Sequence, residues 1–201
     1  MSAAGNLLAA PLFHAGPYAC FEMQRSEVPA LQAFLEANPE YYLNVGDAPP
    51  SPSEARDEFE NLPPAEWSMG KMWVLRFCDA QGRMAGLANV VSDLIATGVW
   101  HVGLFLVATS LHGTGAAPAM YVALEAWMRR SGARWLRLGV VVGNVRGERF
   151  WARCGYREVR QRAGVAMGRR VNAVRVLVKP LVAAPLSDYL AVIARDHPDA
   201  P

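Results

Sequence analysis

The sequence predicts a single α/β domain, and three observations support this fold class. The chain has 201 residues, which is enough for one well-buried core and too few for two. Apolar residues make up 52% of the chain and six residues are tryptophan, which is typical of a packed globular core. Strand-like runs alternate with helical patterns in the order β-α-α-β-β-β-α-β-α-β-β, with no internal repeat.

The first half of the chain supplies the opening strand, two helices and a pair of strands. Residues 18–24 alternate loosely and predict the first strand. Ser26 and Ser53 can cap helices over 27–37 and 54–61, and the Pro/Gly/Asp-rich stretch between these helices predicts a loop. Strands over 71–78 and 82–95 are joined by the turn Asp-Ala-Gln-Gly.

The second half begins with an apolar strand, residues 100–107, which we expect at the centre of the sheet. A helix follows, because the next apolar residues recur at helical spacing: Met120, Ala123, Leu124, Trp127 and Met128. The remaining expected elements are a strand over 134–142, a short helix from the cap Asn144 to about Gly155, a hairpin turning at Gly168, and a short helix near 187–195.

The composition argues against a membrane protein, a secreted protein and a disulfide-rich or metal-binding domain. No run of about 18 apolar residues occurs, and the first sixteen residues lack a basic leader, so we expect no membrane span and no signal peptide. Cys20, Cys78 and Cys154 are odd in number and far apart, which favours a reducing cytoplasm and argues against a disulfide framework or a metal site.

The net charge of +2 conceals an uneven distribution. Residues 1–70 contain ten acidic and two basic residues, a net charge of −8, whereas residues 71–201 carry a net charge of +10. The basic part could favour an anionic ligand and the acidic part a cationic one. The acidic first third and the lack of a basic aromatic motif argue against a nucleic-acid binder.

The stretch LHGTGAAPAM, residues 111–120, predicts an anion site. Gly113 and Gly115 lack Cβ atoms, so their backbone N–H groups can turn toward a phosphate, and the start of the following helix adds unpaired donors. We interpret this loop as a pyrophosphate site. It is neither a Walker loop, because it has no lysine, nor a dinucleotide fingerprint, because position 118 is proline.

Residues 104–159 resemble the Gcn5-related N-acetyltransferase (GNAT) superfamily. The family's strand, glycine loop and helix correspond to the strand ending at Val107 and to His112-Gly113-Thr114-Gly115-Ala116-Ala117. A second family element, an asparagine followed by a short aromatic helix and a glycine, corresponds to Asn144 and Phe150-Trp151-Ala152-Arg153-Cys154-Gly155-Tyr156. The resemblance implies a single mixed, mostly antiparallel central sheet, with helices on both faces and splayed central strands, formed by residues 1–180, with 181–201 as a tail.

The resemblance also implies an acetyl-CoA cosubstrate and direct attack by an amine. The loop 112–117 would bind the pyrophosphate, and Asn144 would bind the pantetheine, whose path Phe150 and Trp151 border. The backbone N–H of Leu106 or Val107 would hold the thioester carbonyl. Trp151 departs from the family pattern, because many members carry there a tyrosine proposed to protonate the leaving thiolate, which an indole cannot do.

The base and the acceptor site are less constrained by the sequence. His101 is a candidate base because a partly desolvated imidazole stays neutral near pH 7, and Glu22 and Asp93 are alternatives. The resemblance assigns the acceptor side to the first two helices and their loop, where Tyr41, Tyr42 and Asn44 are candidate lining residues. We expect a small-molecule or peptide amine as acceptor, with no nucleic acid, membrane or metal.

One alternative function and the oligomeric state stay open at the level of the sequence. A GNAT fold could serve as a non-catalytic CoA-binding sensor or interaction module, which the tryptophan at position 151 weakly favours. The oligomeric state is also open, and a homodimer is among the assemblies that the sequence allows.

Overall fold

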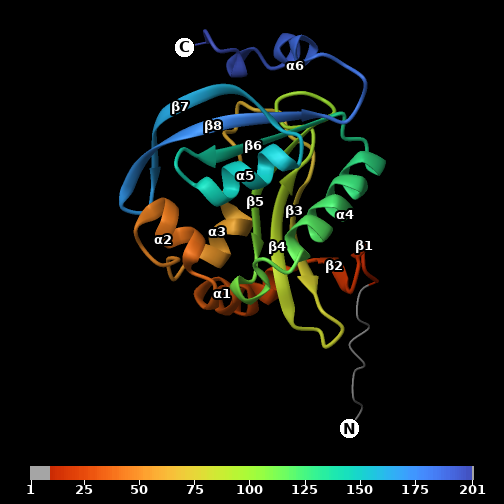
Figure 1. Ribbon diagram of the computed structural model, residues 1–201, viewed down its shortest axis with the longest axis vertical. Coiled ribbons are helices and arrows are strands. Elements are labelled where there is room, and N and C mark those ends of the chain that lie inside the picture. The colour runs from red at the N-terminus through yellow and green to blue at the C-terminus, as the bar shows by residue number, and fades with distance from the viewer. Residues whose placement is uncertain (1–9, 201) are drawn as a thin grey trace.

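The computed structural model describes residues 10–200. Most of the N-terminal stretch considered for a leader therefore lies outside the described residues. Eight strands form one sheet in the order β1-β2-β3-β4-β5-β6-β8-β7 (Figure 1). The strands are β1 (Phe13–Ala15), β2 (Tyr18–Glu22), β3 (Met72–Cys78), β4 (Met84–Val91), β5 (Val99–Val107), β6 (Trp135–Val141), β7 (Arg157–Met167) and β8 (Arg170–Pro180). The helices are α1 (Val28–Ala37), α2 (Glu40–Gly46), α3 (Glu54–Glu60), α4 (Ala116–Arg130), α5 (Val145–Arg153) and α6 (Leu186–Val192).

The sheet confirms the expected mixed, mostly antiparallel architecture. All neighbouring strands are antiparallel except β5 and β6, which are parallel and joined through α4. A parallel pair needs such a crossover, because a short turn cannot return the chain to the same end of the sheet. The short strand β1, which pairs with β2, was not expected from the sequence.

The helices on the first third of the chain differ in detail from the expectation. Ser26 does not cap α1, because residues Arg25–Glu27 form a 3-10 turn and Glu27 occupies the N-cap position. Ser53 precedes α3, but its hydroxyl donates to the Asp57 carboxylate at 3.0 Å and makes no cap to the backbone. The expected loop between the two helices contains α2, which ends at Asp47 in a left-handed conformation.

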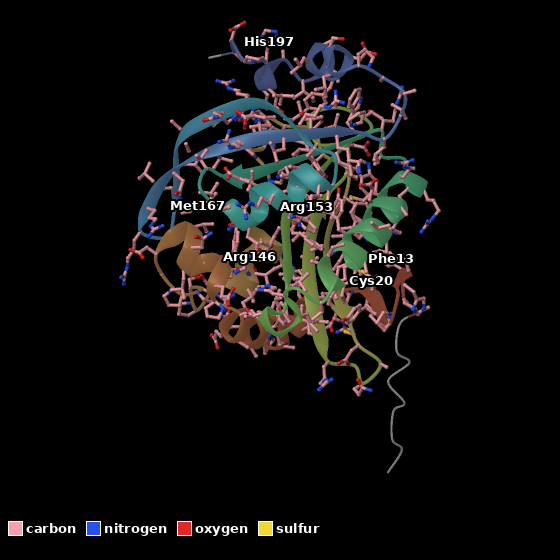
Figure 2. All side chains as sticks on the ribbon, in the orientation of Figure 1. Phe13, Cys20, Arg146, Arg153, Met167 and His197 are labelled. Carbon is pink, nitrogen blue, oxygen red and sulfur yellow. The ribbon has the colours of Figure 1, made fainter. Side chains whose placement is uncertain are left out.

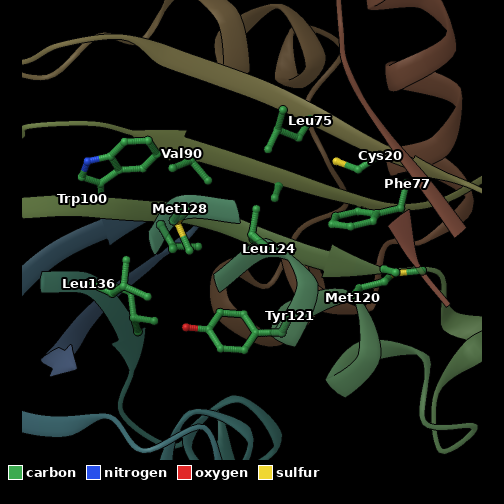
Figure 3. Packing of buried hydrophobic residues seen from close by; sticks show 14 of the residues in the cluster. Cys20, Leu75, Phe77, Val90, Trp100, Met120, Tyr121, Leu124, Met128 and Leu136 are labelled. Atoms are coloured by element: carbon green, nitrogen blue, oxygen red, sulfur yellow. The ribbon is translucent and has the colours of Figure 1, made fainter. Parts of the chain in front are cut away.

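The core lies on both faces of the sheet because β-strand side chains alternate in direction. Met120, Leu124 and Met128 of α4 are fully buried on one face, as their helical spacing predicts, and Figure 3 shows them packed with side chains of the sheet. On the other face, helices α1 and α3 pack Leu31, Phe34, Leu35 and Ala55 against β3, β4 and β5.

The β7–β8 hairpin reaches across to α2 and holds it in place. The backbone N–H of Arg169 donates to the Gly46 carbonyl at 2.7 Å, and Asn172 donates to the Val45 carbonyl at 2.9 Å. Gly46 and Gly168 touch so closely that a Cβ on Gly168 would lie 2.6 Å from the Gly46 carbonyl oxygen. Gly168 also has φ +56°, a conformation that favours glycine. Two residues without side chains are therefore required at this junction.

The C-terminal segment packs against the sheet at the end where β5 and β6 are paired. The expected short helix is present as α6, followed by a 3-10 turn, Ala194–Asp196. Tyr189 and Ile193 are fully buried among Val99, Trp135, Val176 and Val178. Figure 1 shows this segment at one end of the molecule, beyond β8.

Candidate active site

The two central strands separate at Gly103. Pairing between β5 and β6 runs from Val99 opposite Trp135 to Val102 opposite Leu138 and then stops, although both strands continue. At the same position the β4–β5 register shifts, so Asn89 faces Leu104 while Val90 faces Val102, and Gly103 is the extra residue. A bulge bends its strand and ends regular pairing. The splayed central strands expected from the sequence are therefore confirmed.

A large cavity of about 1020 Å³ opens between the separated strands. Its walls come from β5 beyond Val102, from β6 beyond Leu138, from the loop before α4, and from α2 and α5. Among the residues expected to bind cofactor, those that line this cavity are Leu106, Val107, His112, Gly113, Gly115, Ala117, Asn144, Phe150 and Trp151. Thr114 and Ala116 belong to the same loop and helix start but do not line it.

The glycine loop has the geometry of an anion cradle. Gly113 has φ +79° and Gly115 has φ +88°, and nothing lies within 4 Å of the place where either Cβ would be. Within residues 10–200, the N–H groups of these two glycines have no hydrogen-bond acceptor. Donors that turn outward before a helix N-terminus, in a space left clear by glycine, suit a phosphate group. The donors and the cavity beside them fit the diphosphate of a CoA ester.

Helix α5 and its N-cap residue place Asn144, Phe150 and Trp151 on the cavity wall. Asn144 accepts the Gly147 N–H at 3.1 Å and so caps the helix as expected. Trp151 is buried, with its ring 5.2 Å from Tyr121 and 6.0 Å from Phe105. Beside this cluster, the hydroxyl groups of Tyr121 and Tyr156 are hydrogen-bonded at 2.7 Å. These ring contacts make Trp151 part of the packing of the wall.

Three arginines on one face of α5 make the same cavity electropositive. Arg146, Arg149 and Arg153 are spaced i, i+3 and i+7, and all three line the cavity. Arg146 donates to the Glu40 carboxylate at 3.0 Å and to His112 Nδ1 at 2.6 Å, which links α5 to α2 and the glycine loop. Figure 2 shows Arg146 and Arg153 on this helix. The helical spacing of these arginines could have identified them in the sequence.

A second cavity, of about 400 Å³, is acidic and aromatic. Glu54, Asp57 and Glu58 of α3 line it together with Tyr41, Tyr42 and Trp67. Burial next to these carboxylates raises the pKa of Tyr41 to about 12, so its phenol stays neutral. Of the expected acceptor residues, Tyr41 and Tyr42 line this cavity, whereas Asn44 lines the large one. The combination favours a cation bordered by aromatic rings.

The two cavities share Tyr41, Gly103 and Leu104, so they meet at the bulge. Asn89 lies beside this point, with its Oδ1 3.7 Å from the place of a Gly103 Cβ. The Asn89 side chain donates to a Glu58 carboxylate oxygen at 2.9 Å. Glu58 is therefore one residue away from the junction of the two cavities.

Glu58 is a carboxylate with an altered affinity for protons. Its pKa is raised to about 6, mainly by burial and in addition by the Glu54 and Asp57 charges, while the Asn89 hydrogen bond acts in the opposite direction. Glu58 was not among the residues singled out from the sequence. The signal was present, because Glu54, Asp57, Glu58 and Asn61 share one helical face at spacings i, i+3, i+4 and i+7, and all line the cavity.

The three residues expected to act as bases lie in different surroundings. His101 lines the acidic cavity, but Arg137 Nη1 donates to its Nδ1 at 3.4 Å, so the ring proton lies on Nε2. Burial and the Arg137 charge lower the pKa of His101 to about 3, which makes it a weak base. Glu22 pairs with Lys71, and Asp93 accepts the Gly98 N–H at 2.6 Å. Neither Glu22 nor Asp93 lines either cavity.

The described part of the chain lacks two features, a cluster of metal-binding side chains and a helix able to span a membrane. Among residues 10–200, no group of three or more His, Cys, Asp or Glu side chains could hold a metal ion. None of the helices in that range is both long and apolar enough to cross a membrane.

Residues 31–156 match the model of the acetyltransferase (GNAT) family. The chain belongs to this family. It is accordingly a GNAT-family N-acetyltransferase, a family that uses acetyl-CoA, and the resemblance seen in the sequence is confirmed. No curated protein matches the chain significantly.

Solved structures of acetyltransferases share the fold at low sequence identity. An acetyltransferase from Thermus thermophilus is 17% identical with a TM-score of 0.65, covering 84% of this chain and 99% of its own. Spermidine N-acetyltransferase from Vibrio cholerae, in complex with CoA and spermine, is 16% identical with a TM-score of 0.63, covering 82% and 96%. The ribosomal-protein-S18-alanine N-acetyltransferase from Escherichia coli is 14% identical with a TM-score of 0.58, covering 84% and 96%.

Proposed function

We propose that this GNAT-family enzyme transfers an acetyl group from acetyl-CoA to a cationic small-molecule amine by direct attack of the amine. The observation that carries the proposal is the meeting of two cavities of opposite character at the bulge of β5. The arginine-lined cavity suits the anionic cosubstrate, and the carboxylate-lined cavity suits the cationic acceptor.

In this proposal the large cavity binds CoA along its whole length. In the 112–117 loop, the N–H groups of Gly113 and Gly115 hold the pyrophosphate, because those of His112 and Thr114 already donate to backbone carbonyls. Leu106, Val107 and Asn144 hydrogen-bond the pantetheine in the manner of an added strand. Phe150 and Trp151 form an apolar wall beside it. We assign the thioester end to Gly103 and Leu104, in place of the Leu106 or Val107 expected from the sequence, because only the former two residues of β5 also border the acceptor cavity.

The acceptor cavity recognises the amine by charge and by aromatic contact. Three carboxylates from α3 supply negative charge, while Tyr41, Tyr42 and Trp67 supply ring faces. The fold neighbour whose name specifies spermidine is consistent with a cationic acceptor, although the likeness extends to the fold alone. A diamine fits this cavity better than a neutral peptide, because one ammonium group can stay with the carboxylates while the other amine reacts.

We assign the role of base to Glu58, in preference to His101. An attacking amine must lose a proton, and Glu58 is an ionisable side chain on the cavity wall next to the junction. The lone pair of His101 Nδ1 already accepts from Arg137. Trp151 cannot donate a proton to the leaving thiolate, so the thiolate leaves unaided or takes a proton from solvent. With a thiol pKa of about 8.5, this departure is not prohibitive near neutral pH.

The experiment is an amine panel that follows thiol release from acetyl-CoA, repeated with Glu58→Gln across the pH range. For the wild type, kcat/KM should rise through a pKa near 6, and the variant should lose that limb together with at least tenfold in rate. His101→Gln is the matched control and should keep the limb. Absence of turnover with every amine would refute the transfer reaction and favour a CoA-binding module without catalysis.

The cellular location and the oligomeric state of the enzyme are also matters of proposal. We propose a cytoplasmic location, supported by three free cysteines, Cys20, Cys78 and Cys154. The oligomeric state stays open, with a homodimer as one possibility, and size-exclusion chromatography with light scattering would determine it.

A further inference from the structure

The C-terminal segment contains the most enclosed charge among the described residues. Asp196 is fully buried, and both of its oxygens accept several hydrogen bonds. Arg137 donates through Nε at 2.7 Å and through Nη2 at 3.0 Å, Arg162 donates at 3.0 Å, and the Tyr189 hydroxyl donates at 2.6 Å. These donors hold the pKa of Asp196 below its usual value, so the carboxylate is ionised.

Arg137 connects this buried carboxylate to the acceptor cavity. It lies on β6 opposite His101 of β5, one position before the strands separate. Arg137 is only 7% exposed and lies between Asp196 and the cavity, and both Arg137 and His101 line the cavity wall. A guanidinium at such a depth needs a partner, because an unpaired buried charge is strongly unfavourable.

The segment touches the same cavity at a second point. The guanidinium of Arg195 lies over the Trp67 ring at 3.7 Å, and Trp67 lines the cavity. The next residue, Asp196, binds Arg137. Two consecutive residues near the end of the chain therefore support two separate parts of the acceptor wall.

The charge on Arg137 matters because of what faces it. Glu54, Asp57 and Glu58 line the same cavity, and their negative charge is what would attract a cationic acceptor. With Asp196 in place, its carboxylate, which also pairs with Arg162, offsets the Arg137 charge on the side away from the cavity. Without it, Arg137 presents an uncompensated positive charge that repels a cation and attracts the α3 carboxylates.

We propose that Arg195 and Asp196 support the acceptor site from outside the cavity, and that Asp196 is a positioning residue that keeps Arg137 bound and its charge offset so that the cavity selects cationic amines. This inference rests on the proposed acceptor cavity. It concerns the affinity for the acceptor and predicts no change in the binding of CoA, because neither Arg137 nor Asp196 lines the large cavity.

The test compares Asp196→Asn with Asp188→Asn, the same chemical change at an exposed position of the same segment. The probes are hexane-1,6-diamine and hexylamine, which match in length and differ in one cationic group. Asp196→Asn should raise the KM of the diamine at least tenfold and that of hexylamine by less than about threefold. The kcat and the dissociation constant of CoA should stay within about threefold of the wild type, and Asp188→Asn should change nothing.

A second variant separates charge from general damage. Arg137→Gln/Asp196→Asn removes both charges and should restore the diamine KM to within about threefold of the wild type. If Asp196→Asn does not fold, Tyr189→Phe replaces it, because the Tyr189 hydroxyl donates to the same Asp196 oxygen, Oδ2, that accepts from Arg137 Nε. Loss of this donor frees the carboxylate to move away from the guanidinium, and the diamine KM should rise at least fivefold.

The proposal is overturned if folded Asp196→Asn keeps the wild-type diamine KM, or if the double variant is impaired as much as the single one. Where Tyr189→Phe is the variant tested, an unchanged diamine KM also overturns the proposal. If the wild type acetylates neither amine, the proposed reaction fails instead. The comparison is then made on the dissociation constant of the diamine by calorimetry, with the same expected ratios.

Discussion

Gly168→Ala should loosen the acceptor side of the enzyme by breaking the junction between the β7–β8 hairpin and α2. The methyl group would lie 2.6 Å from the Gly46 carbonyl oxygen and 2.9 Å from the Gly46 Cα, so the hairpin or α2 must move. An alanine at φ +56° also costs about 1–2 kcal/mol in backbone strain. Displacement of Gly46 threatens the hydrogen bond from Arg169 N–H to its carbonyl, which contributes about 1 kcal/mol.

Gly164→Ala is the matched control, since Gly164 is on β7 with φ +75° and has nothing within 4 Å of its Cβ position. Gly164→Ala has the same kind of backbone strain at positive φ, but its methyl group contacts no other atom. In thermal unfolding, Gly168→Ala should melt roughly 2–8 °C below the control, because the collision and the weakened hydrogen bond together cost about 1–2 kcal/mol, which corresponds to this shift for a chain of such size. The KM for a diamine should rise as well, since α2 carries Tyr41. Equal melting temperatures and equal KM values in the two variants would refute the reasoning.

Three further predictions concern the cofactor cavity and the half-buried Glu58. Acetyl-CoA at about 100 times its dissociation constant should stabilise the protein by roughly 2.7 kcal/mol, and Gly113→Glu should abolish this thermal shift. Gly82→Glu, at φ +77° in an open turn outside both cavities, should keep it, and a shift retained by Gly113→Glu would contradict the phosphate loop. Trp151→Phe should retain turnover to within about tenfold, because the Trp151 ring packs in the wall and takes no part in the chemistry. Asn144→Ala should lose CoA affinity and about 1 kcal/mol of stability from the lost helix cap. A hundredfold loss of turnover in folded Trp151→Phe would contradict the packing role. Glu58→Gln should stabilise the protein by about 2 kcal/mol at pH 8 and by little at pH 4, because a carboxyl whose pKa is raised to about 6 opposes folding only when ionised. Equal urea midpoints of Glu58→Gln and wild type at pH 8 would show that Glu58 is not desolvated.

The features that the sequence predicted well are set by residues that are close together along the chain. The cap by Asn144, the apolar face of α4 and the hairpin turn at Gly168 each follow from local spacing, and all three are confirmed. The glycine loop is of the same kind, because Gly113 and Gly115 adopt the positive φ that their residue type permits.

The features that the sequence did not predict depend on residues far along the chain. Helix α2 is short and follows Pro39, so local propensity alone does not favour it, and contacts from Asn172 and Arg169 fix its end. The polar face of α3 looks like an ordinary solvated face until the sheet places Asn89 beside Glu58. An aspartate near the end of a chain usually lies on the surface, and only the fold shows that Asp196 is buried against Arg137.

The contact between α2 and the β7–β8 hairpin has a consequence for the order of events during synthesis. The Asn44 carbonyl accepts from Arg170, which is 126 residues further along the chain. At about 5–20 residues per second, a ribosome adds that length in roughly 6–25 seconds. During this interval the residues of α2 have been synthesised and the hairpin that holds α2 in the folded protein has not. The net charge of −8 on residues 1–70 opposes association between partly synthesised chains, because like charges repel. The acidic character that later suits the acceptor thus also serves the nascent chain.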